Sequence, residues 1–259
     1  MPVIISSLVH KKRNMKQITL LIVLSSILFS CQKQKTEVLL CGTIHGAHRI
    51  NINYTYEDLF SFVESYKPDV IGVEIRHEDM DSSVNYLKHN YPSEMYECIT
   101  KYWDKEVLGF DWLGEDLQGI GIPKNYWKEI SVVKRIERER NLDSLMVKKL
   151  SKMDQIKEEK NPILLNASLY ELNNGIYDSL TTIYYQQLAA IHQNTKYSIL
   201  SDSYRQRDEH IAQNIIKIIE RNPGKKLIFL MGAAHRAYSL GKVKEKFGNQ
   251  IVLKNINQY

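Results

Sequence analysis

The sequence predicts an α/β fold: a central, mostly parallel sheet flanked by helices, with a helical insertion and a site at the carboxyl ends of the strands. Two observations carry this prediction. Short apolar runs alternate with amphipathic segments in both halves of the chain, as in βαβ units. The middle of the chain, about residues 124–197, replaces this alternation with a stretch that holds one proline and one glycine, which is typical of helices.

The first 30 residues predict an export leader of the lipoprotein type. They hold four basic residues and no acidic residue, and an uncharged apolar run follows at 18–29. This run is shorter than the roughly 20 residues of a membrane span. Cys31 follows Leu28-Phe29-Ser30, which resembles a bacterial lipobox, so we expect lipid on Cys31 and a tether at 31–36. Alternatives are an uncleaved anchor or ordinary signal cleavage, with Met15 as a second candidate start.

Composition and charge narrow the class of partner. An apolar content of 43% and a charged content of 25% are typical of globular chains and exclude wholesale disorder. Four of the 35 basic residues lie in the leader, so 31 remain against 30 acidic residues. The chain after the leader is therefore nearly neutral and has no surplus of basic residues to bind phosphate backbones, so we expect no nucleic-acid partner. The expected location is outside the cytoplasm, on a membrane, through the lipid of Cys31.

Apolar runs predict five strands, at residues 37–41, 69–75, 107–112, 226–231 and 251–253. After the first strand, Thr55 and Asp58 form a capping-box pattern that begins a helix. A helical stretch opens at Pro92, before the third strand. After the insertion, a helix over about 204–220 ends at Asn222-Pro223-Gly224. The insertion itself is expected to be packing surface or, alternatively, a lid over the site.

Three cysteines give no disulfide framework. If Cys31 carries lipid, only Cys41 and Cys98 remain, and two unpatterned cysteines predict no scaffold. Cys41 lies in an apolar run and is expected to be buried. A bridge between Cys41 and Cys98 stays open on the count alone.

Two strand runs end in the same pattern of glycine, two residues and histidine. These segments are Gly42-Thr-Ile-His45 and Gly232-Ala-Ala-His235. Parallel strands all deliver the chain to the carboxyl edge of the sheet, where ligands bind. Glycine also lets the backbone approach a ligand closely. The sequence therefore predicts that His45 and His235 meet at one edge.

Glu74 lies inside an apolar run, where an unpaired charge is costly to bury. A metal ion, an imidazolium or Arg207 would stabilise it, and Arg207 extends the apolar stripe of the helix that follows the insertion. His45, Glu74 and His235 together suit Zn²⁺, Mn²⁺, Fe²⁺ or Co²⁺ with open positions for water. Such an ion activates bound water and polarises a carbonyl.

Other polar residues are weaker candidates. His48 and Asp111 are plausible further cofactor-binding members of the site, although a turn or cap is the alternative role of Asp111. His210 lies one turn after Arg207 and is expected on a polar face. The remaining histidines of the body show no useful arrangement: His77, His89 and His192.

Four segments, in this order, resemble the TraB/TIKI superfamily, which also takes in ChaN-like haem-binding and erythromycin-esterase-like proteins. They are Gly42–His45, Pro68–Glu74, Arg207–Ala212 and Met231–Arg236. The resemblance covers about residues 37–120 and 200–255 of a domain expected over 37–259. It implies an α/β fold and, for the TIKI branch, a metal-dependent protease that uses His45, His235 and Glu74. Arg207 corresponds to the arginine of the family's Arg-Asn/Asp segment.

The leading hypothesis is a membrane-tethered, metal-dependent hydrolase that acts on a peptide, amide or ester bond of a peptide or small molecule. His45, His235 and Glu74 would hold the ion or its water, with Glu74 alternatively the general base, and Arg207 would stabilise an oxyanion. The chain has no HExxH, GxSxG or P-loop motif. Alternatives are a haem- or metal-binding lipoprotein without catalysis, and an inactive descendant whose insertion binds a partner.

Overall fold

A computed structural model of the chain describes residues 34–258. The predicted leader and the lipid attachment at Cys31 lie outside these residues. Between residues 34 and 258, no helix has the length and apolar character needed to cross a bilayer.

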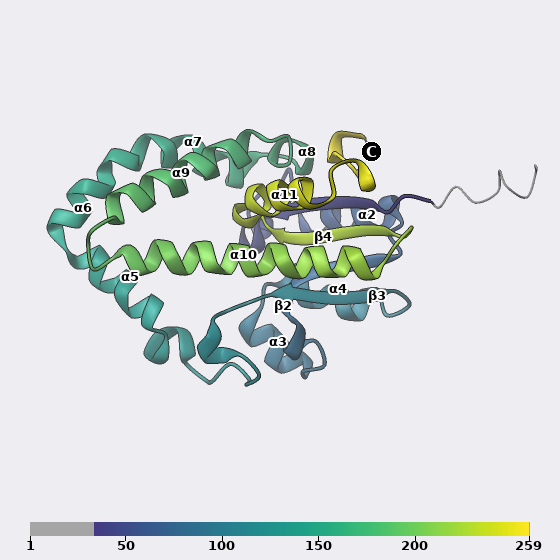
Figure 1. The fold of residues 1–259 in the computed structure, drawn as a ribbon, viewed down its shortest axis with the longest axis horizontal. Coiled ribbons are helices and arrows are strands. Elements are labelled where there is room, and N and C mark those ends of the chain that lie inside the picture. Colours follow the sequence, from purple (N-terminus) through teal and green to yellow (C-terminus); the bar gives the residue numbers. More distant parts are fainter. Residues whose placement is uncertain (1–33, 259) are drawn as a thin grey trace, which may run out of the picture. The chain divides into compact units, whose positions relative to one another are not determined.

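The described chain forms one five-stranded sheet in which all neighbouring strands are parallel (Figure 1). The strands are β1 (Glu37–Thr43), β2 (Val70–Arg76), β3 (Glu106–Asp111), β4 (Lys226–Gly232) and β5 (Val252–Leu253). Their spatial order is β3-β2-β4-β1-β5. The predicted α/β class is confirmed, and the strands that carry or lead to Glu74, His235 and His45 are neighbours at the centre, β2-β4-β1.

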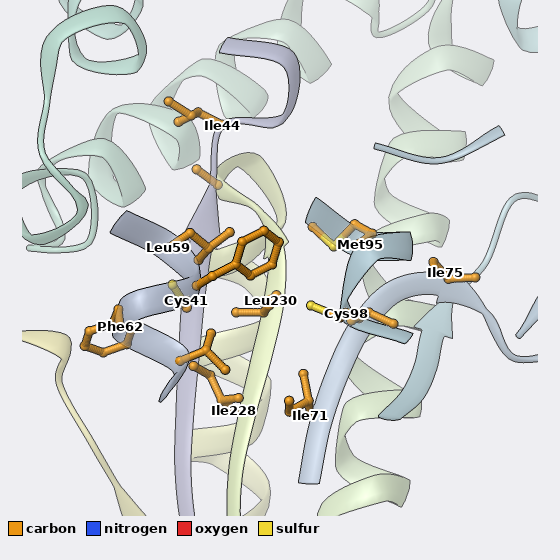
Figure 2. Packing of buried hydrophobic residues seen from close by; sticks show 14 of the residues in the cluster. Cys41, Ile44, Leu59, Phe62, Ile71, Ile75, Met95, Cys98, Ile228 and Leu230 are labelled. Carbon is orange, nitrogen blue, oxygen red and sulfur yellow. The ribbon is translucent and has the colours of Figure 1, made fainter. Parts of the chain in front are cut away.

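Two layers of helices cover the sheet. The helices of the α/β body are α2 (Tyr56–Tyr66), α3 (Val84–Asn90), α4 (Ser93–Lys101), α10 (Ser198–Arg221) and α11 (Ala233–Phe247). One face packs against α2 and α4, where Leu59, Phe62 and Met95 belong to one buried cluster with Ile71 and Ile228 (Figure 2). The other face packs against α10 and α11. Strands buried on both faces are apolar along their whole length, which is why they stand out in the sequence.

Local signals fix some of these elements. Thr55 caps α2 and forms the expected capping box with Asp58. The helix ends at Lys67, whose φ of 52° lies in the left-handed region. Cys41 and Cys98 are buried free thiols, so the described chain has no bridge between them and the expected burial of Cys41 is confirmed.

The predicted insertion is helical and extends beyond the sheet as the teal and green part of Figure 1. It begins with a π-helical turn, Tyr126–Ile130, and continues through α5 (Val132–Leu142), α6 (Ser144–Leu150), α7 (Asp154–Asn166), α8 (Leu169–Leu172) and α9 (Ile176–His192). Arg236 connects it to the sheet: its Nε donates to the Leu40 carbonyl at 3.0 Å, and its Nη1 pairs with Asp178 on α9.

Gly72, in the middle of β2, leaves room for two buried rings. A Cβ there would lie 2.3 Å from Cδ1 of Phe229 and 3.2 Å from Cδ1 of Phe110. We expect Gly72→Ala to lower the free energy of unfolding by about 1–3 kcal/mol, since overpacking shifts the rings. Urea unfolding measures this change. Gly46→Ala is the control, because a Cβ at Gly46 meets nothing within 4 Å; equal stability of the two variants would contradict the expectation.

His192, the last residue of α9, makes the insertion sensitive to acid. It is fully buried beside Tyr197, its Nδ1 lies 2.8 Å from Ser201 Oγ, and its Nε2 has no partner among the described residues. Burial lowers the pKa of His192 from 6.5 to about 4. Between these pH values the unfolded chain binds a proton at His192 that the folded chain does not bind. The contribution of neutral His192 to the free energy of unfolding is therefore complete above pH 6.5 and is lost as the pH falls toward 4.

We expect His192→Gln, which cannot take up this proton, to flatten the loss of stability between about pH 7.5 and about pH 5. Urea unfolding of both proteins at the two pH values is the measurement. An equally steep pH dependence in the variant would assign the acid sensitivity to other groups.

Candidate functional site

The two Gly-x-x-His segments meet at the carboxyl ends of β1 and β4. The register pairs Thr43 with Gly232, so both turns leave the sheet side by side. A Cβ on Gly232 would lie 2.4 Å from Nε2 of His45 and 3.4 Å from Oε2 of Glu74. The glycine of one motif therefore makes room for the histidine of the other.

His45 adopts an unusual backbone conformation. Its φ of 50° lies in the left-handed region, which a residue with a Cβ seldom occupies. Strain of this kind is concentrated at functional sites, where the side chain has to be held in one place. The backbone here places the imidazole over Gly232.

Each site histidine is oriented by a carboxylate on its Nδ1. Nδ1 of His45 lies 2.8 Å from Oε1 of Glu94, a fully buried residue of α4 that also accepts a hydrogen bond from Thr43 Oγ1 at 3.0 Å. Nδ1 of His235 lies 2.5 Å from Oδ1 of Asp208 on α10. A carboxylate on Nδ1 fixes the tautomer that leaves Nε2 as the open nitrogen.

Glu74 lies between these histidines. Its Oε2 accepts a hydrogen bond from the Gly232 N–H at 2.6 Å, and its Oε1 lies 2.8 Å from Arg207 Nη2 and 3.4 Å from His235 Nε2. Burial raises the pKa of Glu74, but the charges of His235, Arg207 and His45 outweigh it and lower the pKa to about 2. Glu74 is therefore a carboxylate at neutral pH.

Arg207 is clamped by two carboxylates. Its Nε and Nη2 pair with the two oxygens of Asp111, each at 3.0 Å, while Nη2 also binds Glu74. Burial disfavours the charge, but Asp111 and Glu74 outweigh it and raise the pKa of Arg207. Nη1 makes no hydrogen bond to the described residues, and a third of the side chain is exposed. The guanidinium is thus fixed on one edge and open on the other.

These side chains line a cavity of about 270 Å³. The structure brings together five predicted site residues: His45, Glu74, Asp111, Arg207 and His235. Trp127 and Lys134 come from the start of the insertion and line the same cavity. The insertion therefore contributes to the wall of the site. A lid over the site, its alternative role, would require such a contribution.

His48, predicted as a cofactor-binding residue, is a structural residue instead. Its Nδ1 donates to the Tyr54 carbonyl at 2.8 Å, and its Nε2 accepts from the Ile44 N–H at 3.2 Å. Both nitrogens are occupied and the side chain is buried. Sequence reasoning missed Asp208 and Glu94. Asp208 directly follows Arg207, a usable signal, whereas nothing in the sequence marks Glu94.

The donor set matches the chemistry of a divalent metal site. Two imidazoles with carboxylates on Nδ1, plus a third carboxylate, are typical ligands. The 3.4 Å between His235 Nε2 and Glu74 Oε1 is close to the roughly 3.3 Å between two ligands of a tetrahedral Zn²⁺. Within residues 34–258, no three His, Cys, Asp or Glu side chains form a ready-made metal site, and the guanidinium of Arg207 is the cation that binds Glu74.

The fold and the site define a parallel α/β protein with a partly buried histidine–carboxylate–arginine cluster at the carboxyl ends of its strands. No family model matches the chain, and comparison with curated proteins and with solved structures finds no match either. The resemblance to the TraB/TIKI superfamily thus rests on the four sequence segments and stays a prediction.

Proposed function

We propose that the protein is a metal-dependent hydrolase that cleaves a peptide, amide or ester bond. The observation that carries the proposal is the pair of carboxylate-oriented histidines, His45 with Glu94 and His235 with Asp208, on either side of Glu74. In His48, which binds backbone groups, both ring nitrogens are satisfied by the surroundings. In His45 and His235, Nδ1 is held and Nε2 is left for a ligand, which is the usual arrangement around a catalytic metal.

His45, Glu74 and His235 would hold the ion, which when bound supplies an activated water and polarises the scissile carbonyl. Glu74 would contribute its carboxylate to the ion or, alternatively, act as the general base. Its hydrogen bonds with the Gly232 N–H and with Arg207 favour the first role, because they hold both carboxylate oxygens in place. Glu94 and Asp208 keep the imidazoles in the required tautomer.

Arg207 would stabilise the negative charge that develops on the substrate oxygen. Donors that are already oriented lower the barrier because they need no reorganisation during the reaction. Asp111 and Glu74 fix the guanidinium through Nε and Nη2 and leave Nη1 for the substrate. Asp111 is thus a positioning residue in this scheme.

The size of the cavity favours a hydrolase over a haem-binding protein. Pockets for drug-sized ligands hold about 300–1,000 Å³, and the site cavity of about 270 Å³ is smaller. It suits the atoms around one scissile bond, with the rest of the substrate along Trp127 and Lys134. A haem macrocycle with an axial histidine has less support from these dimensions.

Protein purified without residues 1–31 tests the proposal by elemental analysis after equilibration with Zn²⁺, Mn²⁺, Co²⁺ or Fe²⁺ and by hydrolysis of mixed fluorogenic peptides and esters. His45→Ala and His235→Ala are expected to lose the metal and at least about 100-fold in kcat/KM. His89→Ala, which changes an exposed histidine that does not line the site cavity, is the control. Protein that binds no metal and keeps full activity as His45→Ala would refute the proposal; a haem Soret band that depends on both histidines would favour the alternative.

We also propose that the chain is exported and tethered to a membrane by lipid on Cys31. The leader composition and the lipobox-like Leu28-Phe29-Ser30-Cys31 support this location. Cys31→Ser in the full-length chain is expected to move the protein from the membrane fraction to the soluble fraction. An unchanged distribution would refute lipidation at this residue.

A further inference from the structure

A second, larger hollow lies between α9, α10 and α11, three helices that run beside one another in Figure 1. Its volume is about 640 Å³, within the range of small-molecule sites. None of the residues that line the site cavity lines this groove. One hydrogen bond links the two cavities: Asp208 lies in the wall of the groove, and its partner His235 lines the site cavity.

The wall of the groove carries more acidic than basic residues: Asp202, Asp208 and Glu245 against Arg205 and Lys242. Arg205 lies 3.7 Å from Asp202, and Lys242 lies 3.2 Å from Glu209, so both cations of the wall have acidic partners. Asp208 is different: its Oδ1 takes the His235 hydrogen bond, and its Oδ2 has no hydrogen bond to the described residues. A ligand that complements this groove therefore carries a positive charge.

Aromatic rings form much of the remaining wall. Tyr185, Tyr204 and Tyr238 line the groove, and the hydroxyls of Tyr204 and Tyr238 are engaged outside it by Glu137 and Glu209. Their fixed hydroxyls hold the two rings in place as wall. Tyrosine rings attract organic cations through the negative face of the ring. Rings and an open carboxylate are the pair of features that recognises an amine with an apolar body.

Small residues give this groove its depth. Ala234, Ala237 and Gly241 lie at helical spacing on the α11 side. A Cβ on Gly241 would meet nothing within 4 Å, so this position opens into free space. The hydroxyl of Thr181, also in the wall, is buried with no hydrogen-bond partner among the described residues.

We propose that the α9–α10–α11 groove binds a small organic cation whose apolar or aromatic body lies along the tyrosines and whose ammonium group pairs with Asp208. The ligand shares this carboxylate with His235, so its binding changes the hold of Asp208 on the imidazole. That consequence for hydrolysis rests on the proposed function, but the binding itself does not.

Three probes that share a phenyl ring on a four-carbon chain and differ in their terminal group test the charge requirement. They are 4-phenylbutylamine, 4-phenylbutan-1-ol and 4-phenylbutyrate. Calorimetric titration of protein without residues 1–31 is expected to give the amine at least about tenfold tighter binding than the alcohol or the carboxylate. Asp208→Asn is expected to remove this preference. Equal affinity of the three probes, or no binding of the amine, would overturn the proposal.

Substitutions at Gly241 test whether the amine binds in this groove, and they leave the residues of the proposed hydrolytic site unchanged. Gly241→Leu fills the groove from α11 and is expected to weaken amine binding at least about tenfold, whereas Gly241→Ala, which also removes a helical glycine, leaves it unchanged. Undiminished binding in Gly241→Leu would place the amine elsewhere and refute the proposal. Because binding is measured directly, its failure is distinguishable from failure of the hydrolase proposal.

Discussion

Gly232→Ala is expected to remove both metal binding and hydrolysis while leaving the fold intact. The new Cβ would lie 2.4 Å from Nε2 of His45, so the imidazole has to leave the position that its partner Glu94 defines. The backbone tolerates alanine, since Gly232 has a φ of −52°. Displacement of a reacting group by about 1 Å costs around 100-fold in rate, and we expect at least that loss in kcat/KM.

Elemental analysis and steady-state kinetics of Gly232→Ala measure these losses, with circular dichroism to verify the fold. Gly46→Ala adds the same methyl group to the residue that follows His45, where nothing lies within 4 Å. It is expected to keep metal and activity. If Gly232→Ala keeps them as well, His45 Nε2 does not act from the position over this glycine.

Arg207→Met is expected to destabilise the protein by about 3 kcal/mol or more, because it leaves two buried carboxylates without their cation. The side chains of Glu74 and Asp111 are 5% and 2% exposed, and Arg207 binds both at 3.0 Å or less. Removing one partner of a buried ion pair is far more costly than losing an exposed pair. Urea unfolding of the metal-free protein measures the change.

A second substitution tests the cause. Asp111→Asn in the Arg207→Met background removes one of the stranded charges and is expected to restore part of the lost stability. Lys225→Met is the matched control, since its pair with Glu106 is half exposed and worth less than about 1 kcal/mol. A loss in Arg207→Met no greater than in Lys225→Met would show that Arg207 does not compensate these carboxylates.

The strands were accessible to prediction because the three central ones, β2, β4 and β1, are buried on both faces and therefore largely apolar. The predicted bounds of β1 to β5 lie within two residues of those observed. The helix α10 was less accessible: it begins at Ser198, before the predicted 204, because Leu200 packs against Met146 and Tyr197 of the inserted region. The helix α11 was not foreseen at all. Its buried stripe includes Arg236 and Ser239, which hide the apolar period.

The carboxylate that orients His45 was also inaccessible to prediction from the sequence. Nothing local distinguishes Glu94 from the other acidic residues of a helix, and only packing of α4 under the β1 turn brings it to His45. His48 shows the opposite case, a residue that the sequence suggested for the site and the structure places elsewhere. It lies close to His45 in the chain, but its ring is buried and binds backbone groups.

The sequence by itself determined the α/β class, the central strands and the convergence of His45, His235 and Glu74, because strand direction delivers all strand ends to one edge. The apolar stripe of its helix directed Arg207 toward them. Only the tertiary structure decided which nitrogen of each histidine is open, that Asp111 clamps Arg207, and that a separate groove lies behind Asp208. These features depend on contacts between residues far apart in the chain. Their distances are set by packing, which leaves no periodic signal in the sequence.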